Sequence, residues 1–341
     1  MVTGGGRANA RARAQRWFTD PELTPVSSAF DARESAASRD LSIGALVARH
    51  RAVHGRPPST LLDVSCGAGE LLATAAELLP GCRLLGIDIS ESAVARARER
   101  VPGADIRVGA AEEAAAYDAW PPLDAVMVHL SLGLWRDPSA GLARIVERLA
   151  ADATLATVDI GRGGGSEPDD PLSAAYLRDQ REASFTVGEL RGLLRDAAPG
   201  ARITVGTTGL AGLDATAPEI PAMLGDPAFL TMIRSAGARA ASRGPSPEVL
   251  HGWVDVHGAP DGRRPATTLR PLPPRAASTS GGSPDAGRSA QARSGLAPPP
   301  ARRGRPARDA DTTESISPGS MTRLMATCAM ATGNSVRSAR R

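Results

Sequence analysis

The chain has 341 residues, of which 42% are hydrophobic and only 3% aromatic. That length exceeds what one α/β domain of about 200 to 250 residues requires. The formal net charge of +3 is unevenly distributed. Residues 258–341 contain about 14 arginines and about 5 acidic residues, which leaves residues 1–257 mildly acidic. The composition therefore argues against a folded part that binds nucleic acid through its overall charge.

Cysteine usage and the lack of long apolar segments indicate the compartment. Cys66, Cys82 and Cys328 are too few and too scattered for a disulfide framework or a zinc site. The first residues, MVTGGGRANARARAQ, lack the apolar core of a signal peptide, and no run of about 18 apolar residues occurs. We expect a cytoplasmic protein that binds neither a membrane nor a metal ion.

Composition divides the chain into three parts. Residues 1–28 are small and polar apart from Trp17 and Phe18, and we expect a flexible N-terminal arm there. Residues 29–257 have the apolar spacing of a folded domain. Residues 258–341 are rich in proline, alanine, serine and arginine, with too few large apolar residues to offset the entropy of ordering. This last part is expected to be a disordered tail.

Short apolar strands alternate with amphipathic helices through the domain. Thr186 and Glu189 have the spacing of a capping box, which predicts the start of a helix. Alternation of this kind implies parallel strands joined by right-handed crossovers. We expect an α/β fold, a doubly wound and mostly parallel sheet of six or seven strands with helices on both faces, its seventh strand only weakly indicated at residues 251–256. The predicted strands are 60–64, 83–87, 104–108, 125–129, 153–160 and 203–207, and the predicted helices are 41–53, 70–79, 90–100, 139–150 and 186–196.

Two aspartates stand at the ends of the first two strands. Asp63 lies in the first strand and Asp88 follows the second, while Ser65 to Gly69 supplies small residues for a sharp turn. The carboxyl ends of neighbouring parallel strands lie together, and open α/β sheets bind ligands at that edge. We expect the two carboxylates to line one ligand site. The alternative for each is a capping role at the adjacent turn or helix.

Three segments resemble the class I S-adenosylmethionine-dependent methyltransferases, which have a Rossmann-like fold. They are LLDVSCGAGE (61–70), GIDIS (86–90) and LDAVMVHLSLGLWRDP (123–138). The resemblance spans roughly residues 40–210. It implies an enzyme whose cofactor is S-adenosyl-L-methionine and whose activity is methyl transfer.

The resemblance also assigns cofactor contacts. It implies that Asp63 faces the methionine end of the cofactor and that the backbone from Gly67 to Gly69 approaches the cofactor closely. Asp88, with Ile89 beside it, is implied to bind the ribose hydroxyls. A carboxylate accepts two hydroxyl hydrogen bonds at once, so this role also suits the chemistry of the side chain.

The sequence departs from the family pattern at two positions. Ser65 replaces the first glycine of the turn, where a positive φ would strain any residue other than glycine. Ala110 stands where an acidic residue is common. Glu112, or the backbone at Ala111, is therefore expected near the adenine. For Glu112 the alternative is an ordinary solvated helix residue.

Methyl transfer requires the protein mainly to position the nucleophile and to exclude water. His129 at the end of the fourth strand is the best-placed candidate for a general base and for a further cofactor contact. A histidine that is hydrogen-bonded within its loop is the alternative.

Four residues lie after the fourth and fifth strands, on segments that cover the acceptor pocket in this family. We expect Trp135, Tyr176, Gln180 and Arg181 to line that pocket. The expected acceptor is a small molecule, methylated on oxygen or nitrogen ahead of carbon.

Three other functions fit parts of the sequence. A methyltransferase directed at nucleic acid, or a non-catalytic binder, would use the arginine-rich tail, and its binding would weaken steeply with salt. An NAD(P)-binding oxidoreductase would also have a glycine turn and a later aspartate, but Leu72 occupies the position of its third small residue. The third alternative is a degenerate relative of the methyltransferases that binds the cofactor poorly. It is motivated by the departures from the family pattern at Ser65 and Ala110.

Overall fold

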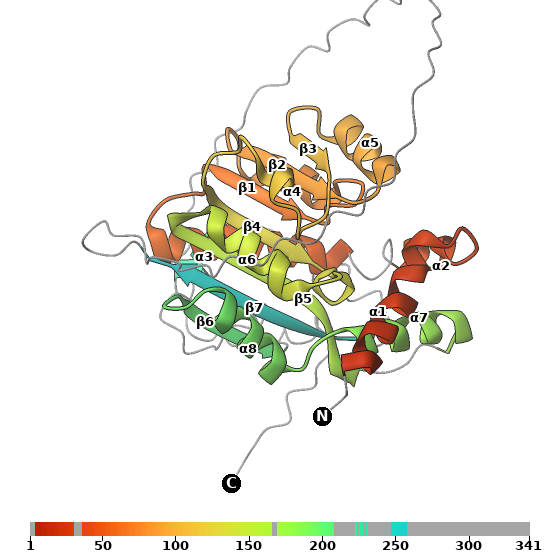
Figure 1. The fold of residues 1–341 in the computed structure, drawn as a ribbon. Coiled ribbons are helices and arrows are strands. Elements are labelled where there is room, and N and C mark those ends of the chain that lie inside the picture. The colour runs from red at the N-terminus through yellow and green to blue at the C-terminus, as the bar shows by residue number, and fades with distance from the viewer. Residues whose placement is uncertain are drawn as a thin grey trace, which may run out of the picture. The chain divides into compact units, whose positions relative to one another are not determined.

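The computed structural model describes residues 4–30, 36–165, 169–207, 222–223, 225–227, 230 and 247–257 (Figure 1). The predicted tail, residues 258–341, lies outside the described residues. The elements in chain order are α1 (Gly4–Thr19), α2 (Thr24–Phe30), α3 (Ala36–His54), β1 (Thr60–Val64), α4 (Glu70–Leu78), β2 (Arg83–Asp88), α5 (Glu91–Arg100), β3 (Asp105–Val108), η2 (Ala114–Tyr117), β4 (Leu123–His129), η3 (Leu132–Leu134), α6 (Pro138–Arg148), β5 (Leu149–Gly165), α7 (Pro171–Ala183), α8 (Val187–Ala197), β6 (Arg202–Thr207) and β7 (Pro247–Val256).

The described strands form one mixed sheet in the order β3-β2-β1-β4-β5-β7-β6. The first five strands in this order pair in parallel, and β7 lies antiparallel between β5 and β6. The expected α/β fold with a mostly parallel sheet is confirmed. The strand order reverses next to β1, which places a switch point between β1 and β4, where open sheets of this kind bind ligands.

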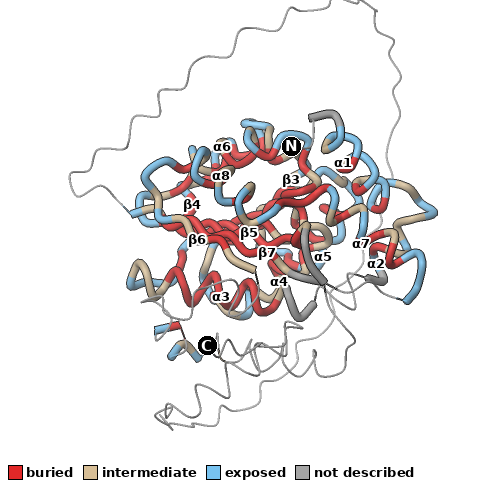
Figure 2. The backbone as a smooth tube through the Cα atoms, turned by 90° about the horizontal axis from the view of Figure 1, so that it is seen from below, coloured by how far each residue is buried: buried red, intermediate tan, exposed pale blue. Residues whose placement is uncertain are grey.

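The strands are mostly buried, and helices lie on both sides of the sheet (Figure 2). One face packs against α3, α4 and α5, for example through Leu61 and Met127, and the other packs against η2, α6 and α8, for example through Leu62 and Val126. Successive residues of a strand point to opposite faces, so parallel strands covered on both sides need nearly continuous apolar sequence. That requirement explains why these strands were visible in the sequence.

A buried ion pair holds the late strand β7 to the early helix α3. The guanidinium of Arg49 donates two hydrogen bonds to the carboxylate of Asp255, with N–O distances of 3.1 and 2.7 Å, and both side chains are fully buried. Arg202 on β6 donates to the same carboxylate at 3.1 Å. Breaking a buried pair by removing one partner leaves an uncompensated charge, so this pair constrains where β7 can lie.

The N-terminal segment differs from the expectation of a flexible arm. Residues 4–19 form helix α1, which lies against α7 (Figure 1). Ala10, Ala14 and Trp17 are buried, and the indole of Trp17 donates to the Asp179 carboxylate at 2.8 Å. Two of the three buried side chains are alanines among arginines, so the apolar stripe was too weak to be seen in the sequence.

Several local predictions are confirmed. Thr186 and Glu189 form a capping box at the start of α8, and Ser90 caps α5 through the backbone N–H of Ala93. The predicted weak strand at residues 251–256 is part of β7. Among the described residues, no helix combines the length and apolarity that crossing a bilayer requires.

The docking of α1 can be tested by truncating its buried aromatic residue. Trp17→Ala should lower the free energy of unfolding by about 3 kcal/mol, because burial of a large side chain is lost. Phe18→Ala is the matched control, since Phe18 is 39% exposed, and it should cost less than about 1 kcal/mol. Urea denaturation measures both. Equal effects of the two substitutions would show that α1 does not dock.

Candidate functional site

The turn after β1 contains three residues with positive φ. Gly67 has φ +53° and Gly69 has φ +80°, and a Cβ atom on Gly69 would lie 3.0 Å from the Cβ of Ala97 on α5. A Cβ on Gly67 would meet no atom of the described residues within 4 Å. Gly69 therefore allows α5 to approach closely, while the space beside Gly67 is open.

Ser65 is the third residue, with φ +62°. A left-handed backbone costs a non-glycine residue about 1 to 2 kcal/mol. The Ser65 hydroxyl accepts a hydrogen bond from the indole N–H of Trp135 at 3.1 Å. Ser65 therefore adopts the glycine conformation that the motif requires, with strain, and gains a contact that glycine could not make.

Asp88 joins the end of β2 to the turn after β1. Its Oδ2 accepts from the backbone N–H of Gly67 at 2.8 Å, and its Oδ1 accepts from the N–H of Ser90 at 2.9 Å. An ionised carboxylate offers about four acceptor positions, so these two bonds leave about two for hydroxyl groups of a ligand. Ile89, which follows, is 67% exposed, unusually so for a large apolar side chain.

Asp63 is the most deeply buried acid at this edge of the sheet, with 2% exposure. Burial raises its pKa well above the ordinary value, the carboxylate of Asp88 raises it further, and the guanidinium of Arg39 on α3 opposes the shift. None of the described residues donates a hydrogen bond to this carboxylate. A buried acid without a donor lacks compensation for its lost hydration, so a cationic or hydrogen-bonding ligand would be favoured beside it.

The predicted adenine-side residues have internal partners. The Ala111 carbonyl accepts from the Tyr117 hydroxyl at 2.9 Å, and Glu112 accepts from the backbone N–H of Asp137 at 2.9 Å. Asp137 caps α6, so Glu112 holds the start of that helix. This contact favours a structural role for Glu112 and leaves the backbone at Ala111 as the remaining predicted contact.

His129 ends β4 on the same face of the sheet as Asp63. Burial, with smaller contributions from the nearby Arg39 and His251, lowers its pKa to about 3. The imidazole is therefore neutral at pH 7 and a weak proton acceptor. This finding argues against the predicted role of His129 as a strong general base, although its position at the ligand-binding edge is as expected.

The predicted acceptor-pocket residues lie in two different environments. Trp135 is buried, and its indole contacts Ser65 in the turn after β1. Tyr176 is also buried and packs edge-on against Trp17 with ring centroids 5.6 Å apart, and the Gln180 amide donates to the Ala14 carbonyl at 3.3 Å. Tyr176 and Gln180 therefore join α7 to α1. Arg181, on the same helix, is half-buried.

The helices α1, α2 and α7 form a cap beside the carboxyl ends of β4 and β5. A small apolar cluster joins them to these strand ends through Ile160 and Leu130. In the sequence, the N-terminal helix and α7 are separated by most of the domain. The prediction of the acceptor pocket did not include the N-terminal segment, which supplies two of the three helices of this cap.

Two further residues at this edge were not predicted. Arg39 lies near enough to both Asp63 and His129 to shift the pKa of each. Asp159 is buried, which raises its pKa to about 7, and it accepts from the backbone N–H of Gly133 at 3.0 Å. Neither belongs to a sequence motif. Only the apolar surroundings of Asp159 in β5 could have drawn attention to it.

The geometry defines a class of protein: an open α/β sheet that presents two carboxylates and a glycine turn at the ends of β1 and β2, the place where such folds bind nucleosides. Comparison with known proteins specifies the family. The methyltransferase domain family matches residues 62–155. Nocamycin O-methyltransferase of Saccharothrix syringae is 34% identical over 230 residues, which cover 60% of this chain and 71% of that protein. The chain belongs to the class I S-adenosylmethionine-dependent methyltransferases.

Solved structures agree with this assignment. The plantazolicin methyltransferase BamL, in complex with a desmethylplantazolicin analog and S-adenosylhomocysteine, is 25% identical with a TM-score of 0.67, over 73% of this chain and 96% of that one. The plantazolicin methyltransferase BpumL is 25% identical with a TM-score of 0.66, over 74% and 97%. The expected enzyme class and cofactor are confirmed, and the oxidoreductase alternative is set aside.

Two substitutions at Ser65 separate the backbone strain from the Trp135 hydrogen bond. Ser65→Gly and Ser65→Ala both remove the hydroxyl, but only glycine relieves the left-handed φ. Ser65→Ala should therefore be less stable than Ser65→Gly by about 1 to 2 kcal/mol in urea denaturation. If the alanine variant is as stable as the glycine variant, residue 65 does not adopt a left-handed backbone in the folded protein.

Proposed function

We propose that this enzyme methylates an oxygen or nitrogen atom of a small-molecule acceptor of the natural-product type. The support is the similarity to nocamycin O-methyltransferase and to the two plantazolicin methyltransferases, together with the cap over the ends of β4 and β5. The main structural support for methyl transfer is a pair of carboxylates, Asp63 and Asp88. They lie at the ends of neighbouring strands, on either side of a glycine turn.

The residues present fit S-adenosylmethionine. Asp88 retains acceptor positions for the ribose hydroxyls, and the open space beside Gly67 admits a ligand next to the backbone. Asp63, buried without a hydrogen-bond donor among the described residues, suits the cationic methionine end. When bound, S-adenosylmethionine supplies a methyl group activated by a positive sulfur. Ile89, exposed beside Asp88, offers an apolar surface for the nucleoside.

Residues of this chain would position the methyl acceptor and exclude water from it. His129 is neutral at pH 7, so it can accept a hydrogen bond from an acceptor hydroxyl or amine and orient it, without removing the proton before transfer. The cap of α1, α2 and α7 packs beside this edge through an apolar cluster and would help to exclude water from a bound acceptor. Orientation of the reactants alone can provide several kcal/mol of the barrier reduction.

The role of Asp88 is tested by cofactor binding. Asp88→Ala should weaken binding of S-adenosylhomocysteine by about 10- to 100-fold, because charge-assisted bonds of about 1.5 to 3 kcal/mol are lost. Isothermal titration calorimetry measures the dissociation constant. Glu99→Gln on the exposed side of α5 removes a nearby charge without touching the site, and it should bind as the parent protein does. A similar loss in both variants would contradict a direct contact.

The acceptor class is tested with a panel of small phenols, carboxylic acids and amines, with methylated products detected by mass spectrometry. We expect product from oxygen or nitrogen acceptors that depends on S-adenosylmethionine and is abolished in Asp88→Ala. Turnover confined to nucleic acid or protein substrates would overturn the proposal while leaving cofactor binding intact.

The pH profile of turnover tests His129. A positioned general base contributes about 10²- to 10⁴-fold, whereas a group whose pKa is about 3 is already neutral across the working range. We therefore expect His129→Gln to lower kcat by less than about tenfold and the parent profile to show no limb from this residue between pH 5 and 8. A loss of more than about a hundredfold, with disappearance of a limb near neutral pH, would restore His129 as the general base.

A further inference from the structure

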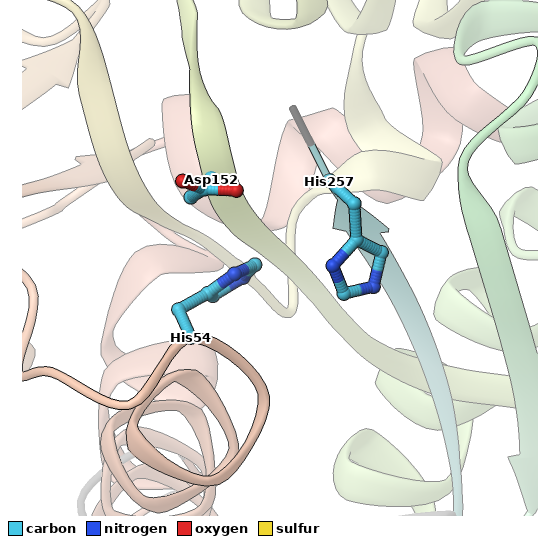
Figure 3. A group of neighbouring side chains, drawn as sticks. All are labelled: His54, Asp152 and His257. Atoms are coloured by element: carbon cyan, nitrogen blue, oxygen red, sulfur yellow. The ribbon is translucent and has the colours of Figure 1, made fainter. Parts of the chain in front are cut away.

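A second cluster of chemically active side chains lies at the opposite edge of the sheet. His54, Asp152 and His257 come together there, and their ligand atoms all lie within 4.8 Å of one another (Figure 3). His54 ends α3, Asp152 lies near the start of β5, and His257 follows β7. In Figure 3 the three side chains point toward a common space.

Strand register explains why residues far apart in the sequence meet. Ala153 pairs with Val256 in the antiparallel β5–β7 ladder, which places Asp152 opposite His257. Alternate residues of a strand share a face, and Ala153 and Val256 pack on the α6 and α8 side. Asp152 and His257 therefore face α3, whose last residue is His54. Three separate elements contribute one ligand each.

Neighbouring groups prepare His54 as a ligand. Its Nε2 lies 3.3 Å from the Thr154 hydroxyl, a contact that helps to orient the ring. The carboxyl end of a helix also favours positive charge, and His54 stands at that end of α3.

His50 adds an independent observation. Its side chain is fully buried one turn earlier on α3, with its ring centroid 4.7 Å from that of His54, and the centroids of His54 and His257 are 5.4 Å apart. Neither ring nitrogen of His50 has a hydrogen-bond partner among the described residues. A buried imidazole without partners is costly in a purely structural setting.

We propose that His54, Asp152 and His257 bind a divalent transition metal ion of the zinc class. Imidazole nitrogens and a carboxylate oxygen suit Zn²⁺, and three protein ligands with one open position, which a water molecule fills, are a common set. Around a tetrahedral ion such ligand atoms would be about 3.4 Å apart, given bonds of about 2.0 to 2.2 Å. Asp152 and His257 are exposed, and changes in their side-chain torsions would bring the ligand atoms to this spacing.

The ion would tie the end of β7 to α3 and β5 at the edge of the sheet away from Asp63 and Asp88. Its role would be to stabilise this edge, since an ion that binds only the folded state raises stability. Because the two sites lie at opposite ends of the parallel strands, we expect S-adenosylhomocysteine to bind equally with and without the ion. The metal proposal and the methyltransferase function are therefore tested independently, and failure of one leaves the other unaffected.

Calorimetry with ZnCl₂ on the full chain, purified without a histidine tag and in chelator-free buffer, tests the proposal. We expect one ion per chain and a rise in Tm of about 5 °C or more at saturating zinc. His257→Ala and Asp152→Asn should each weaken zinc binding by at least tenfold, and because both residues are exposed these variants should fold as the parent does. Glu99→Gln, an exposed carboxylate on α5, is the control and should leave binding unchanged.

Two results would overturn the proposal. One is the absence of saturable binding at millimolar zinc in the correctly folded parent protein. The other is zinc binding that survives both His257→Ala and Asp152→Asn, because the ion would then be held elsewhere. Titration with Co²⁺ gives a second readout, since its visible absorption distinguishes a tetrahedral site from loose octahedral binding.

Discussion

The hydrogen bond between the Asp88 carboxylate and the Gly67 N–H is the contact on which the geometry of the carboxyl ends of β1 and β2 depends. It ties the end of β2 to the turn after β1, while the second oxygen of the same carboxylate receives the N–H of Ser90. The turn can follow this path because Gly67 and Gly69 adopt positive φ and because Gly69 lets α5 approach. A single carboxylate thus shapes the turn and remains able to accept hydroxyl groups.

The segment around η3 connects this end of the sheet to the cap. Asp159 accepts from Gly133, the Leu134 carbonyl accepts from Gln15 on α1 at 2.7 Å, and Trp135 donates to Ser65 in the turn after β1. One short stretch therefore contacts β5, the N-terminal helix and the turn after β1. Through these contacts, the docking of α1 supports the geometry of the turn after β1.

The sequence predicted what depends on neighbouring residues. Buried strands, helix caps and the two aspartates at strand ends are set by local pattern, and they appear in the structure where they were expected. The N-terminal helix was not predicted because its buried stripe consists mainly of alanines. The strand β7 was only weakly indicated, since it is antiparallel and fits between two strands that precede it in the chain.

Contacts between residues far apart in the chain could not be predicted from the sequence. Trp135 and Ser65 are 70 residues apart, and Arg49 and Asp255 are 206 residues apart. No local pattern joins such pairs. The same holds for His54, Asp152 and His257, which lie close together only in the folded chain. The expectation that no metal ion binds was drawn from cysteine spacing and did not consider this cluster. The pKa of His129 also depended on burial that only the fold reveals.

The central claim is that Asp63 and Asp88 jointly hold the cofactor across the glycine turn. A crystal structure of the protein with S-adenosylhomocysteine tests it most directly. We predict the ribose hydroxyls within hydrogen-bonding distance of the Asp88 carboxylate and the homocysteine end beside Asp63 and Gly67. A nucleoside bound at another edge of the sheet, or an Asp88 side chain turned away from it, would contradict the account.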